Sequence, residues 1–375
     1  MVTLLNQTKN SNSVPRLLAA PAFDMIFLIL GRACNMSCAY CLQHDLVHTA
    51  MADISNKVYD FVRSLARRQS RLRLQFYGGE PLVYFETMQA VVTELSDVRD
   101  KLVLTMITNG RALDDDVVDW CNANLDAVAV SWDGPVASST TRGYDVMHER
   151  REQLLRLNNL SFTAVLSAAT FPLDVFDAVD EFNLDYAKLH KGALAGVNLD
   201  ELLCTTPAHP ELADMDFDKL RTQVQVIADE YGDHVVKGKA MSASRLAWIT
   251  SKVNNLKHGV RNGVNDKARC GNGYNVLNLD GAGNLYACHN GDTVVGTIDD
   301  TWTTVLRNVV LHDRAPLHAT GACSKCGLQL MCQNGCPLVT AEDRRRYYCR
   351  QVAALDEPVI DKVLELGQQL GGGEQ

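Results

Sequence analysis

One stretch near the N-terminus is the most informative part of this chain. It reads Met25-Ile-Phe-Leu-Ile-Leu30, then Gly-Arg-Ala, then Cys34-Asn-Met-Ser-Cys38-Ala-Tyr40-Cys41. The apolar run has the length of a buried strand. The cysteines after it have the spacing Cys-x3-Cys-x2-Cys, and three thiolates on one loop can hold three irons of a 4Fe-4S cluster, leaving the fourth iron open. Zinc is the alternative, but it prefers four ligands in pairs, and no fourth cysteine is nearby.

Downstream of this stretch, strand patterns alternate with helix patterns at intervals of about 25 to 35 residues. Repeated units of this kind, with apolar strands, predict a parallel sheet. Six units predict a partial (β/α)6 TIM-like barrel, with the cysteine loop on its C-terminal, chemistry-bearing face. The predicted strands are Met25–Leu30, Leu72–Phe76, Leu102–Ile107, Ala127–Ser131, Phe162–Ser167 and Tyr186–Leu189. The predicted helices are Asn56–Arg67, Leu82–Leu95, Asp114–Cys121, Tyr144–Leu157 and one from about Leu173.

The amino-acid composition of the chain changes after about residue 265. Helical patterns at Phe217–Glu230 and Ala240–Val253 give way to a region rich in Gly, Asn and Cys. A glycine turn between Val276–Leu279 and Asn284–Ala287 predicts a β-hairpin, and a last helix is expected at about Asp356–Leu370. We therefore divide the chain into a polar N-terminal segment (1–20), the barrel (21–235), a bridging helix (236–265), a Cys-rich domain (266–352) and a C-terminal helix and tail (353–375).

Composition narrows the class of protein. The chain has 375 residues and no apolar run of 18, which excludes a membrane-spanning helix, and its start lacks the order of a signal peptide. The net charge of −9 argues against nucleic acid as the main partner. A cytoplasmic location is expected, where thiols stay reduced. The 12 cysteines, most of them in two clusters, therefore indicate metal rather than disulfides.

The first cysteine cluster resembles the defining motif of the radical SAM enzymes, including the aromatic Tyr40 before the last cysteine. Three further motifs follow in order at the ends of predicted strands: Tyr77-Gly-Gly-Glu-Pro81, Thr108-Asn-Gly110 and Ser131-Trp-Asp-Gly-Pro135. The resemblance implies a SAM-binding 4Fe-4S cluster on Cys34, Cys38 and Cys41. It also implies S-adenosylmethionine (SAM) contacts from Tyr40, Gly78, Gly79, Glu80, Asn109, Ser131 and Arg142, with Ser131 and Arg142 holding the methionine carboxylate.

The second cysteine cluster is similar to the SPASM extension of these enzymes, which houses auxiliary 4Fe-4S clusters. The resemblance implies an auxiliary cluster I on Cys270, Cys288 and Cys336. It implies an auxiliary cluster II on Cys323, Cys326, Cys332 and Cys349, making three 4Fe-4S clusters in all. Cluster I lacks a fourth cysteine, so either its last iron is open or a residue such as Asp280, His289 or Asp292 completes it. A zinc-ribbon-like site is the alternative reading of this region.

This family resemblance also implies an activity. The enzyme would cleave SAM reductively and use the resulting 5′-deoxyadenosyl radical to abstract hydrogen from a peptide substrate. The leading hypothesis is maturation of a ribosomally made peptide, forming a thioether or another crosslink or oxidising a side chain. Anaerobic sulfatase maturation and small-molecule dehydrogenation or epimerisation are the alternatives. A reductant such as flavodoxin or ferredoxin is expected. Since the barrel starts near residue 24, a separate leader-binding protein is a possible further partner.

Three remaining residues bear on the site. Cys121 falls in the apolar pattern of a helix, which favours a packing role. Cys204 lies in a loop, and a position facing the substrate cavity is the less favoured interpretation for it. His190 follows the predicted strand Tyr186–Leu189, which would place it on the active face, although a lone histidine is more often structural.

Overall fold

The computed structural model describes residues 23–46, 53–262, 275–314, 323–332 and 335–371. A single nine-stranded sheet runs through them in the order β6-β5-β4-β3-β2-β1-β7-β8-β9. Six parallel strands form the barrel part: β1 Met25–Ile29, β2 Leu72–Tyr77, β3 Leu102–Thr108, β4 Ala127–Ser131, β5 Leu160–Val165 and β6 Gly196–Asp200. The predicted partial α/β barrel is therefore confirmed.

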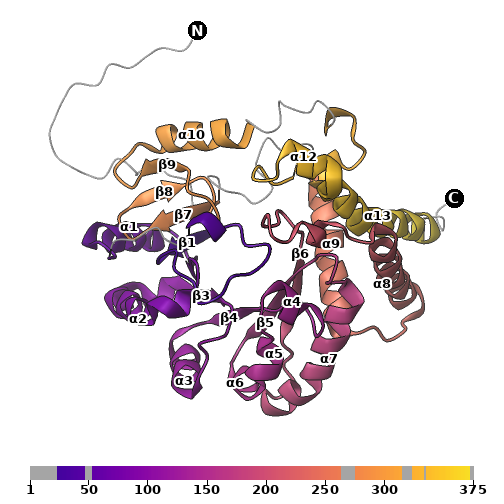
Figure 1. The fold of residues 1–375 in the computed structure, drawn as a ribbon, viewed down its shortest axis with the longest axis horizontal. Helices are drawn as coiled ribbons and strands as arrows, with labels where there is room; N and C mark the ends of the chain where they lie inside the picture. Colours follow the sequence, from indigo (N-terminus) through magenta and orange to yellow (C-terminus); the bar gives the residue numbers. More distant parts are fainter. Residues whose placement is uncertain (1–22, 47–52, 263–274, 315–322, 333–334, 372–375) are drawn as a thin grey trace, which may run out of the picture.

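Helices lie along the outside of these strands (Figure 1). Those of the barrel are α1 Asn56–Arg67, α2 Phe85–Glu94, α3 Asp115–Asn124, α4 Ala137–Thr141, α5 Val146–Glu149, α6 Arg151–Arg156 and α7 Pro172–Leu189. After them come α8 Phe217–Lys237, α9 Ala243–Asn262, α10 Trp302–Arg314, α11 Gln329–Cys332, α12 Ala341–Asp343 and α13 Cys349–Gly371. Within the described residues, no helix combines the length and the apolar character needed to cross a membrane.

Local sequence signals account for several helix ends. The side chain of Asp114 accepts a hydrogen bond from Val117 N at 2.9 Å and so caps α3. Asp216 caps α8 in the same way, through Lys219 N at 2.9 Å. Gly238, in the left-handed conformation with φ of 67°, ends α8. These caps are encoded within a few residues, which is why the helix starts were predictable.

The predicted strand Tyr186–Leu189 is wrong, because these residues form the last turn of α7. Tyr186 continues the apolar stripe of that helix, three or four residues after Phe182 and Asn183, all of them buried. The true sixth strand is Gly196–Asp200, whose Gly, Asn and Asp residues carry little apolar signal. The predicted position of His190 on the active face is wrong for the same reason. A helix that precedes a parallel strand ends near the N-terminal end of that strand, on the side of the sheet away from the active face.

A second difference concerns the predicted helix Tyr144–Leu157. It is interrupted at Arg150, whose φ and ψ of −128° and 25° are not helical, so α5 and α6 are separate. Asp145 fixes the start of α5 by accepting from Trp132 Nε1 at 2.8 Å and from His148 N at 3.4 Å. The segment follows the loop at the end of β4, and the tryptophan contact ties it there.

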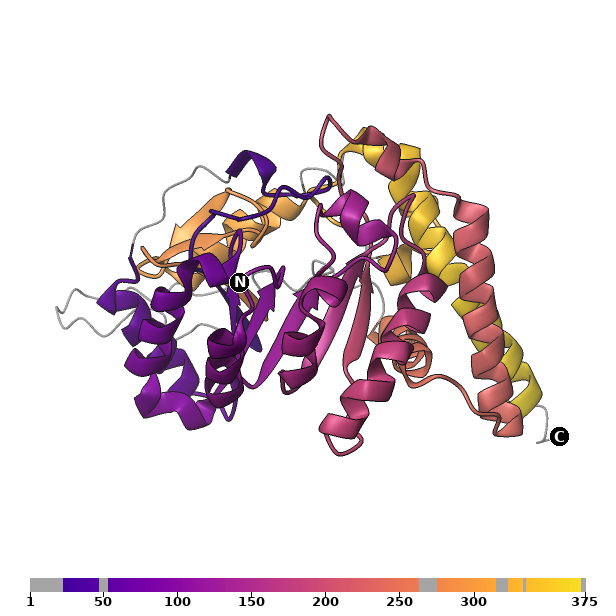
Figure 2. The ribbon, with the colours of Figure 1, turned by 60° about the horizontal axis from the view of Figure 1, so that its bottom comes forward.

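The Cys-rich region continues the barrel sheet. Strand β7, Val276–Asp280, pairs in parallel with β1 along its full length, so the sheet crosses the predicted boundary near residue 265. The predicted hairpin is confirmed: β8 Asn284–Tyr286 pairs antiparallel with β7, and β9 Val294–Thr297 pairs with β8. Figure 2 shows these orange strands beside indigo β1 at one end of the molecule, while α8 and α13 pack together at the other.

Candidate active site

A cavity of about 290 Å³ opens at the C-terminal ends of the parallel strands. The three cysteines of the loop after β1 line it. So do all seven residues that the sequence assigned to SAM: Tyr40, Gly78, Gly79, Glu80, Asn109, Ser131 and Arg142. These residues come from the ends of β1 to β4, which lie far apart in the chain. The alternation of the strands explains the arrangement, because one face packs on the helices and the other, with Ile107, Ser131 and Thr163, faces the cavity.

Two polar side chains lie against the cysteine sulfur atoms. Asn109 Nδ2 is 3.8 Å from Cys34 Sγ, and Arg142 Nη1 is 4.0 Å from Cys38 Sγ. Burial raises the pKa of the Cys38 thiol to about 11, although Arg142 opposes this. Without metal the thiol therefore keeps its proton, and an iron that binds must displace it. A cation and an amide donor beside the sulfurs suit the negative charge of a thiolate-bound cluster.

The arrangement of these thiols fits a cluster better than a single ion. Among the described residues, no three Cys, His, Asp or Glu side chains converge closely enough to hold one metal ion. In a 4Fe-4S cluster each cysteine binds a different iron, so its sulfur atoms stay spread around the cube. Cys34, Cys38 and Cys41 line one cavity, and each is partly buried. The donor set therefore fits the iron–sulfur cluster implied by the motif.

Gly78 and Gly79 let the loop after β2 pack against the cysteine loop. A Cβ on Gly79 would lie 2.4 Å from the carbonyl oxygens of both Arg32 and Ala33, and one on Gly78 would lie 2.2 Å from Gly31 O. The backbones are joined by hydrogen bonds from Gly79 N to Gly31 O and from Glu80 N to Ala33 O, both 2.9 Å. Close backbone approach between the two loops is thus one reason for glycine here.

Glu80 joins the end of β2 to the end of β3. Its carboxylate is buried and accepts hydrogen bonds from Thr108 Oγ1 at 2.5 Å, Asn109 N at 2.7 Å and Leu82 N at 3.0 Å. Burial raises the pKa of Glu80, and these donors oppose the shift. The glutamate thus positions Asn109 beside Cys34. This role connects two of the motifs that the sequence showed only separately.

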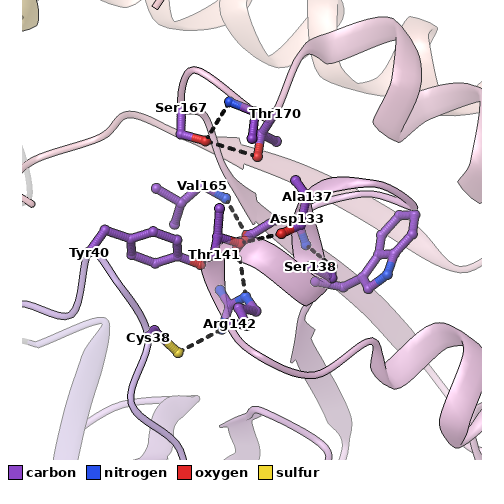
Figure 3. Close-up of polar contacts among 12 residues, drawn as sticks. Cys38, Tyr40, Asp133, Ala137, Ser138, Thr141, Arg142, Val165, Ser167 and Thr170 are labelled. Carbon is purple, nitrogen blue, oxygen red and sulfur yellow. Dashed lines mark hydrogen bonds and ion pairs between the residues drawn. The ribbon is translucent and has the colours of Figure 1, made fainter. Parts of the chain in front are cut away.

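Asp133 binds several side chains close to the cavity (Figure 3). It follows β4 and is completely buried. Its carboxylate binds the side chains of Tyr40, Thr141 and Arg142. Burial alone would lower the pKa of Arg142, but Asp133 and Tyr40 raise it overall, so the guanidinium stays charged. Asp133 is part of the motif Ser131-Trp-Asp-Gly-Pro135, but the sequence alone predicted no function for it.

The loop after β8 supplies a further wall, which the sequence did not predict. His289 and Asn290 line the cavity. The ring of His289 stacks on Phe27 at 4.0 Å, and Asn290 Oδ1 accepts from Tyr77 OH at 2.6 Å. Buried Arg32 binds the same loop, donating to His289 O and Gly291 O at 2.7 Å. Burial and Arg32 lower the pKa of His289 to about 4, which keeps the ring neutral.

The C-terminal cysteines are only partly described. Burial and the charges of Cys323 and Cys326 raise the pKa of Cys349, which places these three thiols within electrostatic range of one another. Cys332 and Cys336 are partly buried in the neighbouring turns, and Cys288 lies beside His289. Cys270 lies outside the described residues. One of the candidate fourth ligands is fully engaged: Asp280 accepts four hydrogen bonds within the β7–β8 turn, from Ala282, Asn284 and Tyr286.

The remaining sequence candidates lie away from the cavity wall. Cys121 is buried in the core, as its helical pattern suggested. Cys204 is partly buried, and its thiol contacts Tyr40 O at 3.6 Å. His190 ends α7, stacks on Tyr186 and contacts Leu155 O at 2.8 Å, so it has a packing role. The true sixth strand reaches the cavity with its last residue, Asp200, and the residues 201–203 that follow it also line the cavity.

The fold and site are a partial barrel with a three-cysteine loop at its C-terminal face, and the comparisons agree with this class of protein. The Radical SAM superfamily model matches residues 28–157. The radical SAM cyclopropyl synthase TigE of Paramaledivibacter caminithermalis is 24% identical over 198 residues, 47% of this chain and 41% of that protein. The matched region is thus less than half of that relative's length. Residues 28–157 thus form a Radical SAM domain, and proteins of that superfamily bind SAM and a 4Fe-4S cluster.

Solved structures share the fold over most of the chain. Native anSMEcpe with bound AdoMet has a TM-score of 0.62 at 17% identity, covering 92% of this chain and 100% of that one. SuiB of Streptococcus suis has a TM-score of 0.52 at 13% identity, covering 84% and 74%. At such identities the likeness establishes the fold alone. That fold is the radical SAM barrel with a cysteine-rich C-terminal region.

Proposed function

We propose that this protein is a radical SAM peptide maturase, an enzyme that modifies a ribosomally made peptide. The observation that carries the proposal is the shared cavity. It combines three thiols suited to a cluster with glycine backbone, Asn109, Ser131 and Arg142 from three successive strand ends. The groups proposed to hold the cluster and those proposed to bind SAM therefore face the same cavity. A binding scaffold would have no use for such a set of groups around one cavity.

Each residue has a distinct task in this proposal. Cys34, Cys38 and Cys41 hold three irons and leave the fourth for the amino and carboxylate groups of SAM. When bound, the reduced cluster and SAM supply a 5′-deoxyadenosyl radical that abstracts a hydrogen atom. The backbone near Gly79 receives the methionine amino group, while Ser131 and Arg142 receive the carboxylate. Tyr40 and Glu80 keep the two loops that carry these groups in place.

The C-terminal cysteines carry two auxiliary clusters in this proposal. Cluster I takes Cys270, Cys288 and Cys336, and cluster II takes Cys323, Cys326, Cys332 and Cys349. The position of Cys288 supports a role in the reaction, because its neighbours His289 and Asn290 line the cavity. A cluster held there could take up the electron that a substrate radical releases. A flavodoxin or ferredoxin would supply the electron for SAM cleavage.

A peptide is the favoured substrate. The relative TigE is named a radical SAM cyclopropyl synthase. A structure of anSMEcpe with bound AdoMet and the Cp18Cys peptide has a TM-score of 0.61 to this chain. The product would be a thioether or another crosslink, or an oxidised side chain, and a separate protein could bind the leader. We also propose the domain division given above, in which α9 bridges the barrel and the Cys-rich region.

The first test is anaerobic reconstitution with iron and sulfide, followed by SAM and dithionite. We expect about twelve irons per chain, the content of three 4Fe-4S clusters, and release of 5′-deoxyadenosine. The variant in which Cys34, Cys38 and Cys41 are all alanine should release none, and its Mössbauer spectrum should retain two clusters. A colourless protein with tightly bound zinc, or unchanged release by the variant, would overturn the assignment.

The second test concerns the substrate. Short peptides encoded beside the gene are incubated with the reduced enzyme and analysed by mass spectrometry, with the triple-alanine variant as control. A crosslink or a side-chain oxidation appears as the loss of two hydrogens that only the active enzyme produces. Conversion of a sulfatase-derived peptide alone would favour formylglycine formation instead. Conversion of a small molecule alone would rule out the peptide assignment.

A further inference from the structure

We propose that Asp133 is a positioning residue for SAM: its carboxylate holds the guanidinium of Arg142 in the orientation that receives the carboxylate group of SAM. The inference rests on the proposed function, because that proposal is what assigns Arg142 to SAM. Asp133 itself is completely buried and is not among the residues that line the cavity, so it acts through its neighbour.

Four donors fix the Asp133 carboxylate (Figure 3). Its Oδ2 accepts from Tyr40 OH at 2.5 Å, Thr141 Oγ1 at 2.6 Å and Arg142 Nε at 3.0 Å. Its Oδ1 accepts from Val165 N at 3.0 Å. These donors come from the cysteine loop, the end of α4 and strand β5. The carboxylate is therefore fixed against rotation by three separate parts of the barrel.

The bound carboxylate in turn determines which edge of the guanidinium stays available. Asp133 takes the Nε edge of Arg142, while Nη1 points to Cys38 Sγ at 4.0 Å. The guanidinium lies over the Tyr40 ring, 5.4 Å from its centroid, which limits rotation about the side chain. A guanidinium presents its donors as a rigid fork, so fixing one edge directs the other. Arg142 itself lines the proposed SAM cavity, as Ser131 does.

The charge of Asp133 matters as well as its shape. The side chains of Arg142 and Asp133 are 9% and 0% exposed, so their ion pair is almost completely shielded from water. Removing one charge of such a pair leaves the other uncompensated. An asparagine at position 133 keeps the size but loses the negative charge and one of the two acceptor oxygens, so the ion pair is lost and the four donors compete for one amide oxygen. Part of the binding free energy of SAM would then be used to orient the guanidinium of Arg142.

The test measures SAM binding to reconstituted protein without any peptide, by calorimetry and by the EPR change that SAM causes in the reduced cluster. We expect D133N to raise the Kd for SAM about tenfold or more, as expected for a charged hydrogen-bonded contact. R142A should weaken binding at least as much. If Asp133 acts through Arg142, the double variant should bind no worse than R142A alone. D145N is the matched control, because Asp145 caps α5 and binds Trp132 but not Arg142.

Several results separate a positioning role from a purely structural one. Positioning predicts unchanged iron content and an unchanged EPR spectrum of reduced D133N before SAM is added. Wild-type affinity in D133N, or a full further loss in the double variant, would overturn the proposal. If D133N does not fold, T141V removes one donor to Oδ2 and should weaken SAM binding by a smaller factor. Wild-type protein that binds SAM but modifies no peptide contradicts the substrate assignment and leaves this inference intact.

Discussion

Gly79 shows how one missing side chain brings two loops together. A methyl group there would meet two carbonyl oxygens of the cysteine loop at 2.4 Å, and backbone atoms cannot swing aside. We expect Gly79→Ala to push the loops apart and to lower both the iron content and 5′-deoxyadenosine release at least tenfold. Iron analysis and product chromatography measure the two quantities.

Gly367→Ala is a suitable control for this variant. Gly367 lies in α13 with open space around its Cβ position, so alanine there should stabilise the helix by about 0.5–1 kcal/mol. Normal iron incorporation by Gly79→Ala would show that the loops can adjust and that the glycine has another purpose.

Glu80 gives a second prediction for a single residue. Both oxygens of the Glu80 carboxylate accept hydrogen bonds, so an NH2 group in place of either oxygen would face a donor. Glu80→Gln should therefore lower the free energy of unfolding by about 1–3 kcal/mol, because a buried donor would face other donors. Urea unfolding measures this change. Equal stability of the two proteins would mean that the carboxyl group is protonated and already acts as a donor.

At this scale the sequence predicted several of the residues that line the cavity, but not how they contact one another. The motifs gave Cys34, Glu80, Asn109 and Arg142 by residue type and spacing. The link between Glu80 and Asn109 spans two strands, and the role of Asp133 depends on a tyrosine 93 residues away. Such contacts exist only after the strands are side by side, so a linear pattern cannot contain them.

Helix α7 and strand β6 provide the prediction at the level of elements. The hydroxyl of Tyr186, near the end of α7, donates to Leu157 O at 2.8 Å and accepts from Leu160 N at 3.3 Å. Tyr186→Phe should lower the free energy of unfolding by about 1–3 kcal/mol, because two buried backbone groups lose their partner. Denaturant titration provides the measurement.

A second tyrosine serves as the comparison for Tyr186→Phe. Tyr144 is partly exposed, and its ring is contacted by Arg111, so Tyr144→Phe should change stability by less than about 0.5 kcal/mol. If the two variants behaved alike, residues 186–189 would not anchor the helix to β5. The strand prediction for this segment failed because four residues, three of them apolar, fit a strand and a helix turn equally well.

At the level of the whole molecule, buried Arg32 connects the barrel with the β8–β9 loop. It donates to His289 O and Gly291 O, and to Gln43 Oε1 at 2.9 Å. Arg32→Met should lower the free energy of unfolding by roughly 3 kcal/mol, since several buried acceptors lose a charged donor. Hydrogen exchange in residues 284–297 should also become faster.

Arg67→Met is the matched control for this variant. Arg67 is largely exposed and pairs with Asp97 on the surface, so its loss should cost less than about 1 kcal/mol. Unchanged exchange in residues 284–297 of the Arg32→Met protein would show that strand pairing alone holds the loop. The pairing of β7 with β1 would then be the main interaction that holds the barrel and the Cys-rich region together.

The sequence by itself determined the order of the first five βα units, the helix caps, the hairpin, the cysteine loop and the resemblance to the radical SAM enzymes. Each of these depends on neighbours in the chain, because periodicity, capping and ligand spacing act over a few residues. The tertiary structure decided that β7 extends the barrel sheet, that His289 and Asn290 reach the cavity, and that Asp133 holds Arg142. Those features depend on which distant segments become neighbours, and burial gives the resulting polar contacts their strength.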